Sequence, residues 1–350
     1  MSQNTVDIDI VPLTDDAEER WDSFVMDQPN ATFFHRAGWR RVIENTFGYT
    51  TYFVYAEQDG RIRGVLPLVH TGKGLFGNRL VSTSFCVQGG PLAVDEKTRR
   101  SLDTHAIQLT DRLGVAWLEF RSTEPTRADW TCRSDLYFLS RKEIDPEPDK
   151  ILKAIPRKQR AVVRKALKRG DLRDEIDENS KRFYKVYSTS VRNLGSPVFS
   201  KKYCQELKRE FRDDCEFLTV VGPDGQPVSS VVSFYFKDEV LPYYGGGMPA
   251  ARRLGAQSFM YYRLMCRAAE RGVRIFDFGR SKRNTGAYSF KRHFGFELKP
   301  LHYEFKLRKG QSIPEANPLN PQYQKFISMW KHLPLPVAGL VGPYLVKRLG

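Results

Sequence analysis

One short segment of the sequence places a cation among aromatic side chains. Residues 286–296 read GAYSFKRHFGF, so three phenylalanines and a tyrosine surround Lys291 and its two basic neighbours. A lysine on an aromatic surface is partly desolvated, and its field then reaches an anionic ligand or a developing oxyanion with little screening. The segment therefore predicts a charge-stabilising role for Lys291. The alternative is an ordinary surface lysine, because most lysines are exposed.

Basic residues also recur along one predicted helix. A helix that starts at Pro156 would place Arg157, Arg160, Arg164 and Lys168 within roughly 80° of arc, at 100° per residue. The residues on the opposite side would be Ile155, Val162 and Ala166. Aligned cations repel one another unless an anion lies between them, so the row indicates an anion-binding face. A solvated basic surface is the alternative explanation.

The composition agrees with an anionic partner. The chain of 350 residues has a formal net charge of +15, which suits nucleic acid, anionic lipid or a phosphorylated small molecule. Its hydrophobic content of 41% is sufficient for the cores of two globular domains. The five cysteines lack paired spacing, so we expect neither a metal site nor a disulfide framework, in keeping with a reducing cytoplasm.

The two ends of the sequence carry no clear targeting or spanning signal. The first twenty residues lack the basic and apolar regions of a secretory signal. Residues 333–346 carry no charge, but they are shorter than the ~20 residues that a membrane-spanning helix needs. We expect a tail packed on a domain, or an interfacial contact in which Lys331, Lys347 and Arg348 touch anionic head groups.

The elements that must position these residues occur twice. Two regions, offset by about 160 residues, share the order strand, Asp-Gly turn, strand, glycine-rich strand end, helix ending at glycine, and strand. The turns are at 59–60 and 224–225, and the helix-terminating glycines are Gly114 and Gly272. This order predicts an α+β unit with a mixed sheet, present twice.

The charged, proline-containing segment RKEIDPEPDK at 141–150 is typical of a linker or of the edge of a domain. We therefore expect an N-terminal domain at 1–145, a C-terminal domain at 146–312 that carries the active site, and a tail at 313–350. The first copy lacks a counterpart of the SFKRHFG segment, which favours chemistry in the second copy and a role for the first in completing the acceptor site.

Six segments in this order resemble the Fem-type (FemAB/FemX) aminoacyl transferases, which are duplicated GNAT-fold enzymes. They read FFHRAGWRRVI, PRKQRAVVRKALKRG, TSVRNLGSPVFSKKYCQEL, YYGGGMPAARRLGAQ, FDFGRS and SFKRHFG. The absence of a long coiled-coil arm makes the chain similar to the FemAB-like branch found with exosortase/PEP-CTERM and exopolysaccharide loci. The resemblance covers nearly the whole chain and implies two tandem GNAT domains with mixed central sheets.

The resemblance also implies an activity. In peptidoglycan-building members, aminoacyl-tRNA donates to a peptide amine on a diphosphate-linked precursor. The FK pair of that family aligns with Phe290 and Lys291, and the arginine that holds the acceptor's diphosphate aligns with Arg192. A basic residue after the early tryptophan corresponds to Arg41, near Trp39. The implied enzyme binds no cofactor of its own and no metal, and its partners are the acyl donor and an anionic, amine-bearing envelope precursor.

Acyl transfer to an amine assigns roles to further residues. Asp277, in FDFG, could orient the amine or accept its proton through water; alternatively it fixes neighbouring backbone or an arginine. Glu119 takes the matching place in the first copy, and His293 could act as a base. Substrate contacts are expected for Arg157, Arg160 and Arg164, and also for Tyr243 and Tyr244, beside the three glycines at 245–247 where a ligand can approach the backbone.

Two other functions remain open. ARRLGAQ resembles the pyrophosphate loop of acetyl-CoA-dependent enzymes at Arg252 and Gly255, although Gln257 stands where that loop has glycine or alanine. The chain could therefore be an acyl-CoA-dependent N-acyltransferase acting on a sugar or lipid amine. It could also be a non-catalytic module that binds an anionic glycolipid or RNA. We expect no DNA partner, and a cytoplasmic protein with a possible peripheral contact to the inner membrane.

Overall fold

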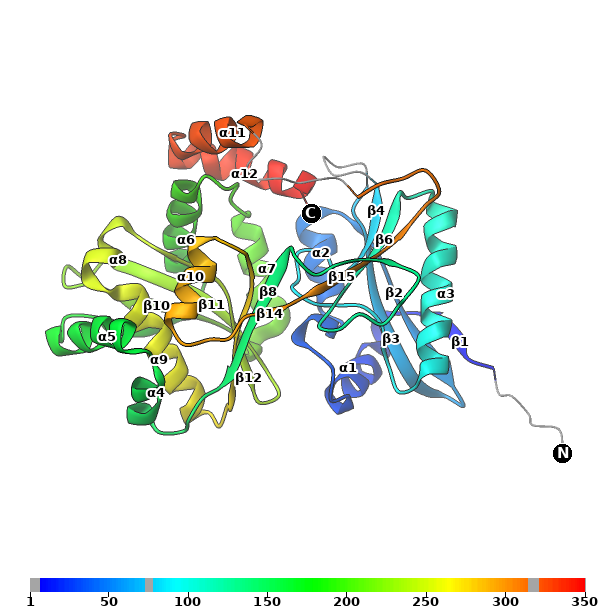
Figure 1. Cartoon of the computed structure of the whole chain (residues 1–350), viewed down its shortest axis with the longest axis horizontal. Helices are drawn as coiled ribbons and strands as arrows, with labels where there is room; N and C mark the ends of the chain where they lie inside the picture. The colour runs from blue at the N-terminus through cyan, green and yellow to red at the C-terminus, as the bar shows by residue number, and fades with distance from the viewer. Residues whose placement is uncertain (1–6, 73–77, 314–320, 350) are drawn as a thin grey trace. The chain divides into compact units, whose positions relative to one another are not determined.

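The computed structural model describes residues 7–72, 78–313 and 321–349 (Figure 1). The chain divides into two compact units. Unit 1 comprises 1–134, 301–315 and 347–350, and unit 2 comprises 135–300 and 316–346. Among the described residues, no helix combines the length and the apolar character needed to span a bilayer.

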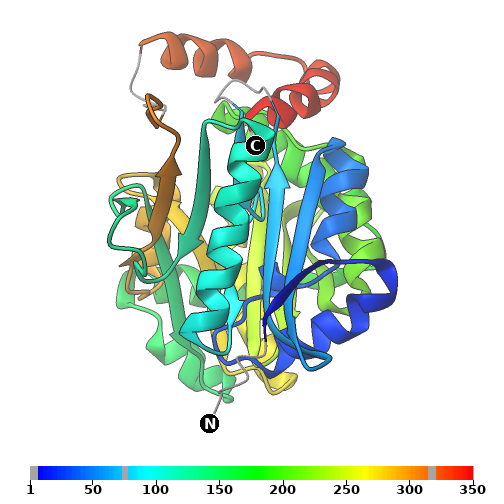
Figure 2. The same ribbon diagram turned by 90° about the vertical axis from the view of Figure 1, so that its right-hand side faces the viewer.

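Unit 1 is built on a mixed sheet in the order β1-β2-β3-β4-β6-β15-β7, with β5 paired to β3. The strands are β1 Asp9–Pro12, β2 Thr50–Gln58, β3 Arg61–His70, β4 Arg79–Ser82, β5 Leu92–Ala93, β6 Trp117–Ser122, β7 Thr131–Arg133 and β15 His302–Leu307. The helices are α1 Glu18–Asp27, α2 Trp39–Phe47 and α3 Glu96–Leu113, with short 3-10 turns at Asp15–Ala17 and Phe33–His35. Helix α3 lies lengthwise on the sheet and contacts β2, β3 and β6 (Figure 2).

Unit 2 is built on a second mixed sheet in the order β14-β8-β13-β12-β11-β10-β9. Its strands are β8 Tyr137–Glu143, β9 Arg173–Asp177, β10 Cys215–Val221, β11 Pro227–Phe236, β12 Glu239–Gly247, β13 Ile275–Lys282 and β14 Lys299–Pro300. Its helices are α4 Pro148–Ala154, α5 Arg157–Arg169, α6 Lys181–Leu194, α7 Lys201–Phe211, α8 Pro249–Leu254, α9 Ala256–Glu270, α10 Gly286–His293, α11 Pro321–Lys331 and α12 Leu335–Leu349, with a 3-10 turn at Arg212–Asp214.

The two sheets have the same topology, which confirms the predicted duplication of an α+β unit. In each sheet, antiparallel strands surround one parallel pair, β4 with β6 in unit 1 and β12 with β13 in unit 2. The local signals were also read correctly. Asp59 and Gly60 both have positive φ, at 51° and 71°, in the two-residue turn between β2 and β3. Gly114 ends α3 in the left-handed conformation.

The units exchange one strand each, and here the structure differs from the predicted boundaries. Strand β8 follows the first repeat in sequence but pairs with β13 in the second sheet, and β15 follows the second repeat but pairs with β6 in the first. The segment 141–150 is therefore not a linker, because Arg141–Glu143 complete β8 and α4 begins at Pro148. Each sheet uses the exchanged strand to cover a backbone edge that would otherwise be unpaired.

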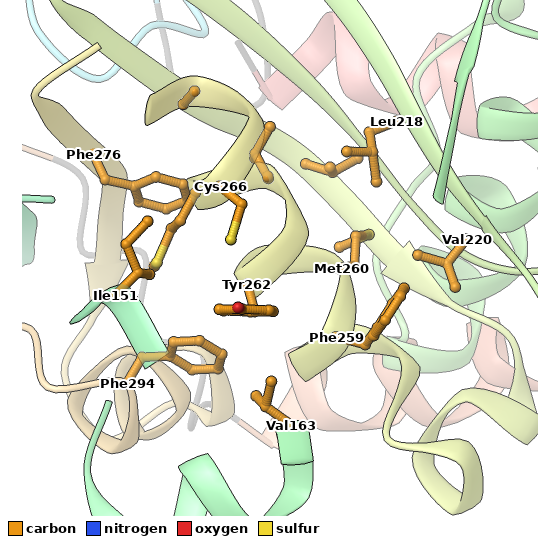
Figure 3. Close-up of a cluster of buried hydrophobic side chains, with 14 of the residues drawn as sticks. Ile151, Val163, Leu218, Val220, Phe259, Met260, Tyr262, Cys266, Phe276 and Phe294 are labelled. Carbon is orange, nitrogen blue, oxygen red and sulfur yellow. The ribbon is translucent and has the colours of Figure 1, made fainter. Parts of the chain in front are cut away.

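The core of unit 2 is centred on α9. The side chains of Phe259, Met260 and Cys266 from this helix pack with Phe276 of β13 and Val163 of α5 (Figure 3). Helix α5 contributes Val163 and Ala166 to this core. Of the three residues predicted on the buried face, Ile155 and Ala166 are buried as expected, whereas Val162 is 39% exposed and its neighbour Val163 is fully buried instead.

Candidate active site

Lys291 lies on α10, and its ammonium is buried. Its Nζ donates hydrogen bonds to the carbonyl oxygens of Gly279, at 2.9 Å, and Arg280, at 3.1 Å. The ring centroid of Phe278 lies 5.8 Å from Nζ. Phe290, the residue before Lys291, packs its ring against Tyr261 and against the core. The ring that lies near Nζ among the described residues belongs to β13 and not to the segment 286–296, and the catalytic role of Lys291 stays a prediction.

Asp277 binds the same backbone segment as Lys291, at the N–H group of Gly279. Its Oδ1 accepts a hydrogen bond of 2.7 Å from the Gly279 N–H, while Lys291 donates to the Gly279 carbonyl. Gly279 has φ of 65°, a conformation that side chains other than glycine rarely adopt. In the pairing of β13 with β8, residues 278 and 279 lie opposite Ser140 alone, which makes this segment a β-bulge. The acid and the base therefore fix a bulge in the middle of the pairing between β13 and β8, just past the last residue of β13 that pairs with β12.

Burial shifts the pKa values of both groups toward neutrality. Desolvation raises the pKa of the Asp277 carboxyl from 3.8 to about 6, against the hydrogen bond from Gly279. Desolvation lowers the pKa of the Lys291 ammonium from 10.5 to about 7, against the attraction of Asp277. Such a pair can exchange protons with a substrate near physiological pH, whereas an exposed pair would stay fully charged.

The parallel strands β12 and β13 diverge next to this pair. They pair at Glu239 with Ile275 and at Val240 with Phe276, and no further pairing joins these two described strands. A bulge in β12 follows at once, since Val232 pairs with Tyr244 and Ser233 with Pro242, leaving Tyr243 unpaired. Glycines 245–247 end the strand. The facing edges of the two strands thus stop pairing with each other where Asp277 and Lys291 lie, while β12 stays paired with β11 and β13 with β8.

Tyr261 of α9 reaches across this divergence. Its ring centroid lies 4.7 Å from that of Phe278 on β13 and 5.5 Å from that of Phe290 on α10. On the β12 side, a Cβ atom added at Gly245 would lie 3.0 Å from the Tyr261 hydroxyl oxygen. Tyr261 therefore lies between the two strands with its ring against aromatic side chains of β13 and α10, and a side chain at position 245 would crowd its hydroxyl.

Helix α5 brings the basic row to the same neighbourhood. The residue before its first turn packs closely on the end of α10, since a Cβ added at Gly295 would lie 3.0 Å from Pro156 Cδ. Its centre packs closely on the α8–α9 junction, since a Cβ added at Gly255 would lie 3.1 Å from Val162 Cγ1. Arg160 donates to the Lys153 carbonyl at 2.7 Å. Arg157 and Arg164 are exposed and form no hydrogen bond or ion pair with a described residue.

The segment that resembles a pyrophosphate loop is a short helix. Arg252 is exposed on α8, and Gly255, with φ of 69°, joins α8 directly to α9. The Gly255 N–H donates to the Arg252 carbonyl at 3.3 Å, so it is not available to a phosphate. No side chain caps the first turn of α9. Phosphate binding at this place would rest on Arg252 and the start of α9.

Three other predicted residues have partners of their own. Arg192 lies in the last turn of α6, and its Nη1 donates to the Lys331 carbonyl at the end of α11, at 3.1 Å. In unit 1, Arg41 pairs with Glu18, and Trp39 is fully buried with its indole N–H donated to the Phe33 carbonyl at 3.0 Å. A substrate contact by any of the three stays a prediction without support from this placement.

Tyr243 and Tyr244 belong to an aromatic cluster with α6 and α7. The ring centroid of Tyr244 lies 5.9 Å from that of Tyr187 and 5.2 Å from that of Phe199. Both tyrosines are half-buried, so each keeps part of its ring accessible at the diverging end of β12.

Sequence reasoning missed Gly279 and Tyr261. The glycine after the strand in FDFG is a signal for a bulge that could have been used, but nothing in the sequence indicates the reach of Tyr261. In unit 1, Glu119, the counterpart of Asp277, is neutralised by Arg121 at 2.8 Å. No group of three or more His, Cys, Asp or Glu side chains among the described residues could hold a metal.

Residues 157–292 match the family model for an acetyltransferase (GNAT) domain. Unit 2 carries a GNAT-type acyltransferase domain. The match spans α5 to α10, which includes Asp277, Lys291 and the diverging strands. No curated protein sequence matches the chain.

Solved structures share the fold over most of the chain. FemX is 14% identical with a TM-score of 0.66, over 85% of this chain and 96% of that one. The C-terminal domain of a protein described as a lysylphosphatidylglycerol synthetase, from Agrobacterium fabrum, is 16% identical with a TM-score of 0.56, over 83% and 91%. A tandem GNAT protein from the clavulanic acid biosynthesis pathway is 13% identical with a TM-score of 0.52, over 86% and 98%. These likenesses show that the chain has the tandem GNAT fold.

Proposed function

We propose that the protein transfers an aminoacyl or acyl group to the amine of an anionic cell-envelope precursor. The observation that carries the proposal is the buried ammonium of Lys291. Two of its three N–H groups donate to carbonyls, and the third has no acceptor among the described residues. A buried, unsatisfied donor beside diverging strands is suited to a developing oxyanion or a donor phosphate.

The reaction follows from the groups present. The neutral amine attacks the carbonyl carbon of the donor ester or thioester, and the tetrahedral oxyanion accepts the remaining N–H of Lys291. The amine proton passes through water to Asp277, which then returns it to the leaving oxygen or sulfur. Collapse of the intermediate forms the amide, breaks the ester or thioester bond and releases the ribose hydroxyl or the thiol. Holding both reactants in place lowers the activation barrier by on the order of 7 kcal/mol.

The phosphates of the donor would lie along α5. Arg157 and Arg164 are exposed and unpaired with any described residue, and a guanidinium binds phosphate through two parallel hydrogen bonds. Both candidate donors, aminoacyl-tRNA and acyl-CoA, carry phosphates. The likeness to FemX and to a lysylphosphatidylglycerol synthetase favours aminoacyl-tRNA and an envelope acceptor. An exopolysaccharide or exosortase-linked setting belongs to the same proposal.

An acyl-CoA donor with a sugar or lipid amine as acceptor is the second candidate. The match to a GNAT acetyltransferase domain favours it. The junction between α8 and α9 disfavours it, because the Gly255 N–H donates to the Arg252 carbonyl and is not available to the pyrophosphate of coenzyme A. A non-catalytic binding module would tolerate the loss of Lys291 and Asp277.

The test compares donors and one matched pair of variants. Purified protein is incubated with labelled aminoacyl-tRNA or labelled acyl-CoA and a lipid-linked amine acceptor, and label in the acceptor is measured. We expect transfer from aminoacyl-tRNA, reduced at least ~100-fold in Lys291→Met, in the range of a lost oxyanion donor. Lys142→Met is the control, since Lys142 is half-buried and donates to the Phe294 carbonyl at 3.1 Å. Equal losses in both variants, or normal activity in Lys291→Met, would contradict the role of Lys291.

A further inference from the structure

Helix α12 exposes an apolar stripe. Val337, Leu340, Val341 and Tyr344 recur at helical spacing within about 100° of arc. Leu340 is 80% exposed and Tyr344 58%. The opposite side is buried at Ala338, and a Cβ added at Gly342 would lie 2.8 Å from the Val198 backbone. The helix is thus fixed on unit 2 by one face while the other presents large apolar side chains to solvent.

A basic groove lies beside this stripe. It has a volume of about 640 Å³ and is lined by residues of α6, the start of α7 and α12. Three lysines line it, Lys181, Lys185 and Lys201, and none forms an ion pair with a described residue. Leu340 belongs both to the groove wall and to the apolar stripe. None of the described residues that line the groove is acidic.

The charge of the tail extends this pattern. Between residues 321 and 349 every charged residue is basic, namely Lys325, Lys331, Lys347 and Arg348. The lysines of the groove come from elements more than a hundred residues earlier in the sequence, so folding gathers cations around an apolar helix. An apolar stripe flanked by cations is the pattern of an interfacial helix on an anionic bilayer.

We propose that α12 and the adjoining groove dock the protein on an anionic phospholipid surface. Leu340, Val341 and Tyr344 enter the acyl boundary, and the three groove lysines hold a lipid phosphate. A polyanion such as RNA would bind the lysines but would leave the apolar stripe without an apolar partner. A second copy meeting the same face across a two-fold axis would bring equal clusters of lysines together, which repel.

The apolar part is tested by sedimentation with vesicles of phosphatidylcholine, alone or mixed with phosphatidylglycerol. We expect binding to the mixed vesicles and a loss of at least about tenfold in Leu340→Asn/Val341→Asn. Met26→Asn, at an exposed position of α1 in unit 1, is the control and should bind as the unmodified protein does. Melting temperatures verify that both variants fold. The assay contains no acyl donor, so its result is independent of the proposed reaction.

The basic part is tested with a charge-matched pair. Lys181→Gln/Lys185→Gln/Lys201→Gln should weaken binding to the mixed vesicles at least about tenfold, while the triple change Lys153→Gln/Lys158→Gln/Lys165→Gln on α4 and α5 should leave most of it. Equal binding to both vesicle types, equal losses in the two triple variants, or normal binding by the α12 variant would overturn the proposal. The proposal would also be overturned if the protein did not bind vesicles and instead formed a dimer that the α12 variant abolishes. The same holds if the protein did not bind vesicles but retained tRNA at the groove.

Discussion

At the scale of single residues, Lys291 and Asp277 bind the two backbone groups of one residue, the carbonyl and the N–H of Gly279. The pairing explains why both can be buried: each has a backbone partner, and each offsets part of the other's charge. The sequence identified both residues as candidates. It could not show that both residues bind to Gly279, because the bulge at Gly279 depends on the register of β13 with β8.

The pKa shifts predict the pH dependence of transfer. Asp277 must be ionised to accept a proton, so activity should appear as pH rises through about 6. Lys291 must be charged, so activity should decline as pH rises through about 7. We expect a narrow bell in kcat/KM, measured with saturating acceptor. In Lys291→Arg the alkaline limb should disappear, because arginine stays protonated; an unchanged alkaline limb would exclude Lys291 as its source.

The same shift has a signature in stability that does not require activity. The folded-state pKa of Lys291 is depressed, so the stability that its neutral form contributes is present above 10.5 and is lost as pH falls through about 7. As pH falls through this range, the free energy of unfolding measured with urea should decline less in Lys291→Met than in the unmodified protein. A parallel decline in both would indicate an unshifted lysine.

At the scale of elements, the structure assembles three segments that are separate in the sequence. Helix α5 packs between the end of α10 and the α8–α9 junction, so the basic row lies near Lys291. The sequence predicted the helix and its arginines. It placed Val162 on the buried face, where the structure has Val163, because the direction from which α9 contacts α5 decides between these two residues.

The helix offers a matched test of phosphate binding. Arg157→Gln/Arg164→Gln should raise the donor KM about tenfold or more and flatten its salt dependence, since charge-assisted bonds to phosphate would be lost. Lys158→Gln/Lys165→Gln, an equal change in charge on the same helix, should have a much smaller effect. Similar KM values in the two double variants would mean that the row acts through general charge.

At the scale of the whole molecule, the exchanged strands make the two halves of the sequence interdependent. Glu304, on β15, is fully buried in unit 1 and accepts hydrogen bonds from the N–H groups of Thr126, at 2.9 Å, and Arg127, at 2.8 Å. It also pairs with the Arg127 guanidinium at 2.8 Å. Residues late in the sequence therefore complete the core of the first unit.

The exchange predicts a large effect from one distant residue. Glu304→Ala leaves Arg127 buried without part of its countercharge and should lower the free energy of unfolding by about 3–5 kcal/mol. Lys306→Ala, on the same strand, removes an exposed pair with Asp129 and should cost less than about 1 kcal/mol. Urea unfolding followed by tryptophan fluorescence measures both. Equal, small losses would mean that β15 is not needed by the first unit.

The sequence by itself determined the duplicated α+β unit, its hairpin turns, its helix ends and the candidates Lys291 and Asp277. These follow from local periodicity, from glycine at left-handed positions and from the pairing of charge with aromatic residues, all of which act over a few neighbouring residues. Tertiary structure decided the exchange of β8 and β15, the bulge at Gly279, the reach of Tyr261 and the groove beside α12. Each of these depends on strand register or on contacts between segments far apart in the chain, which local patterns do not encode.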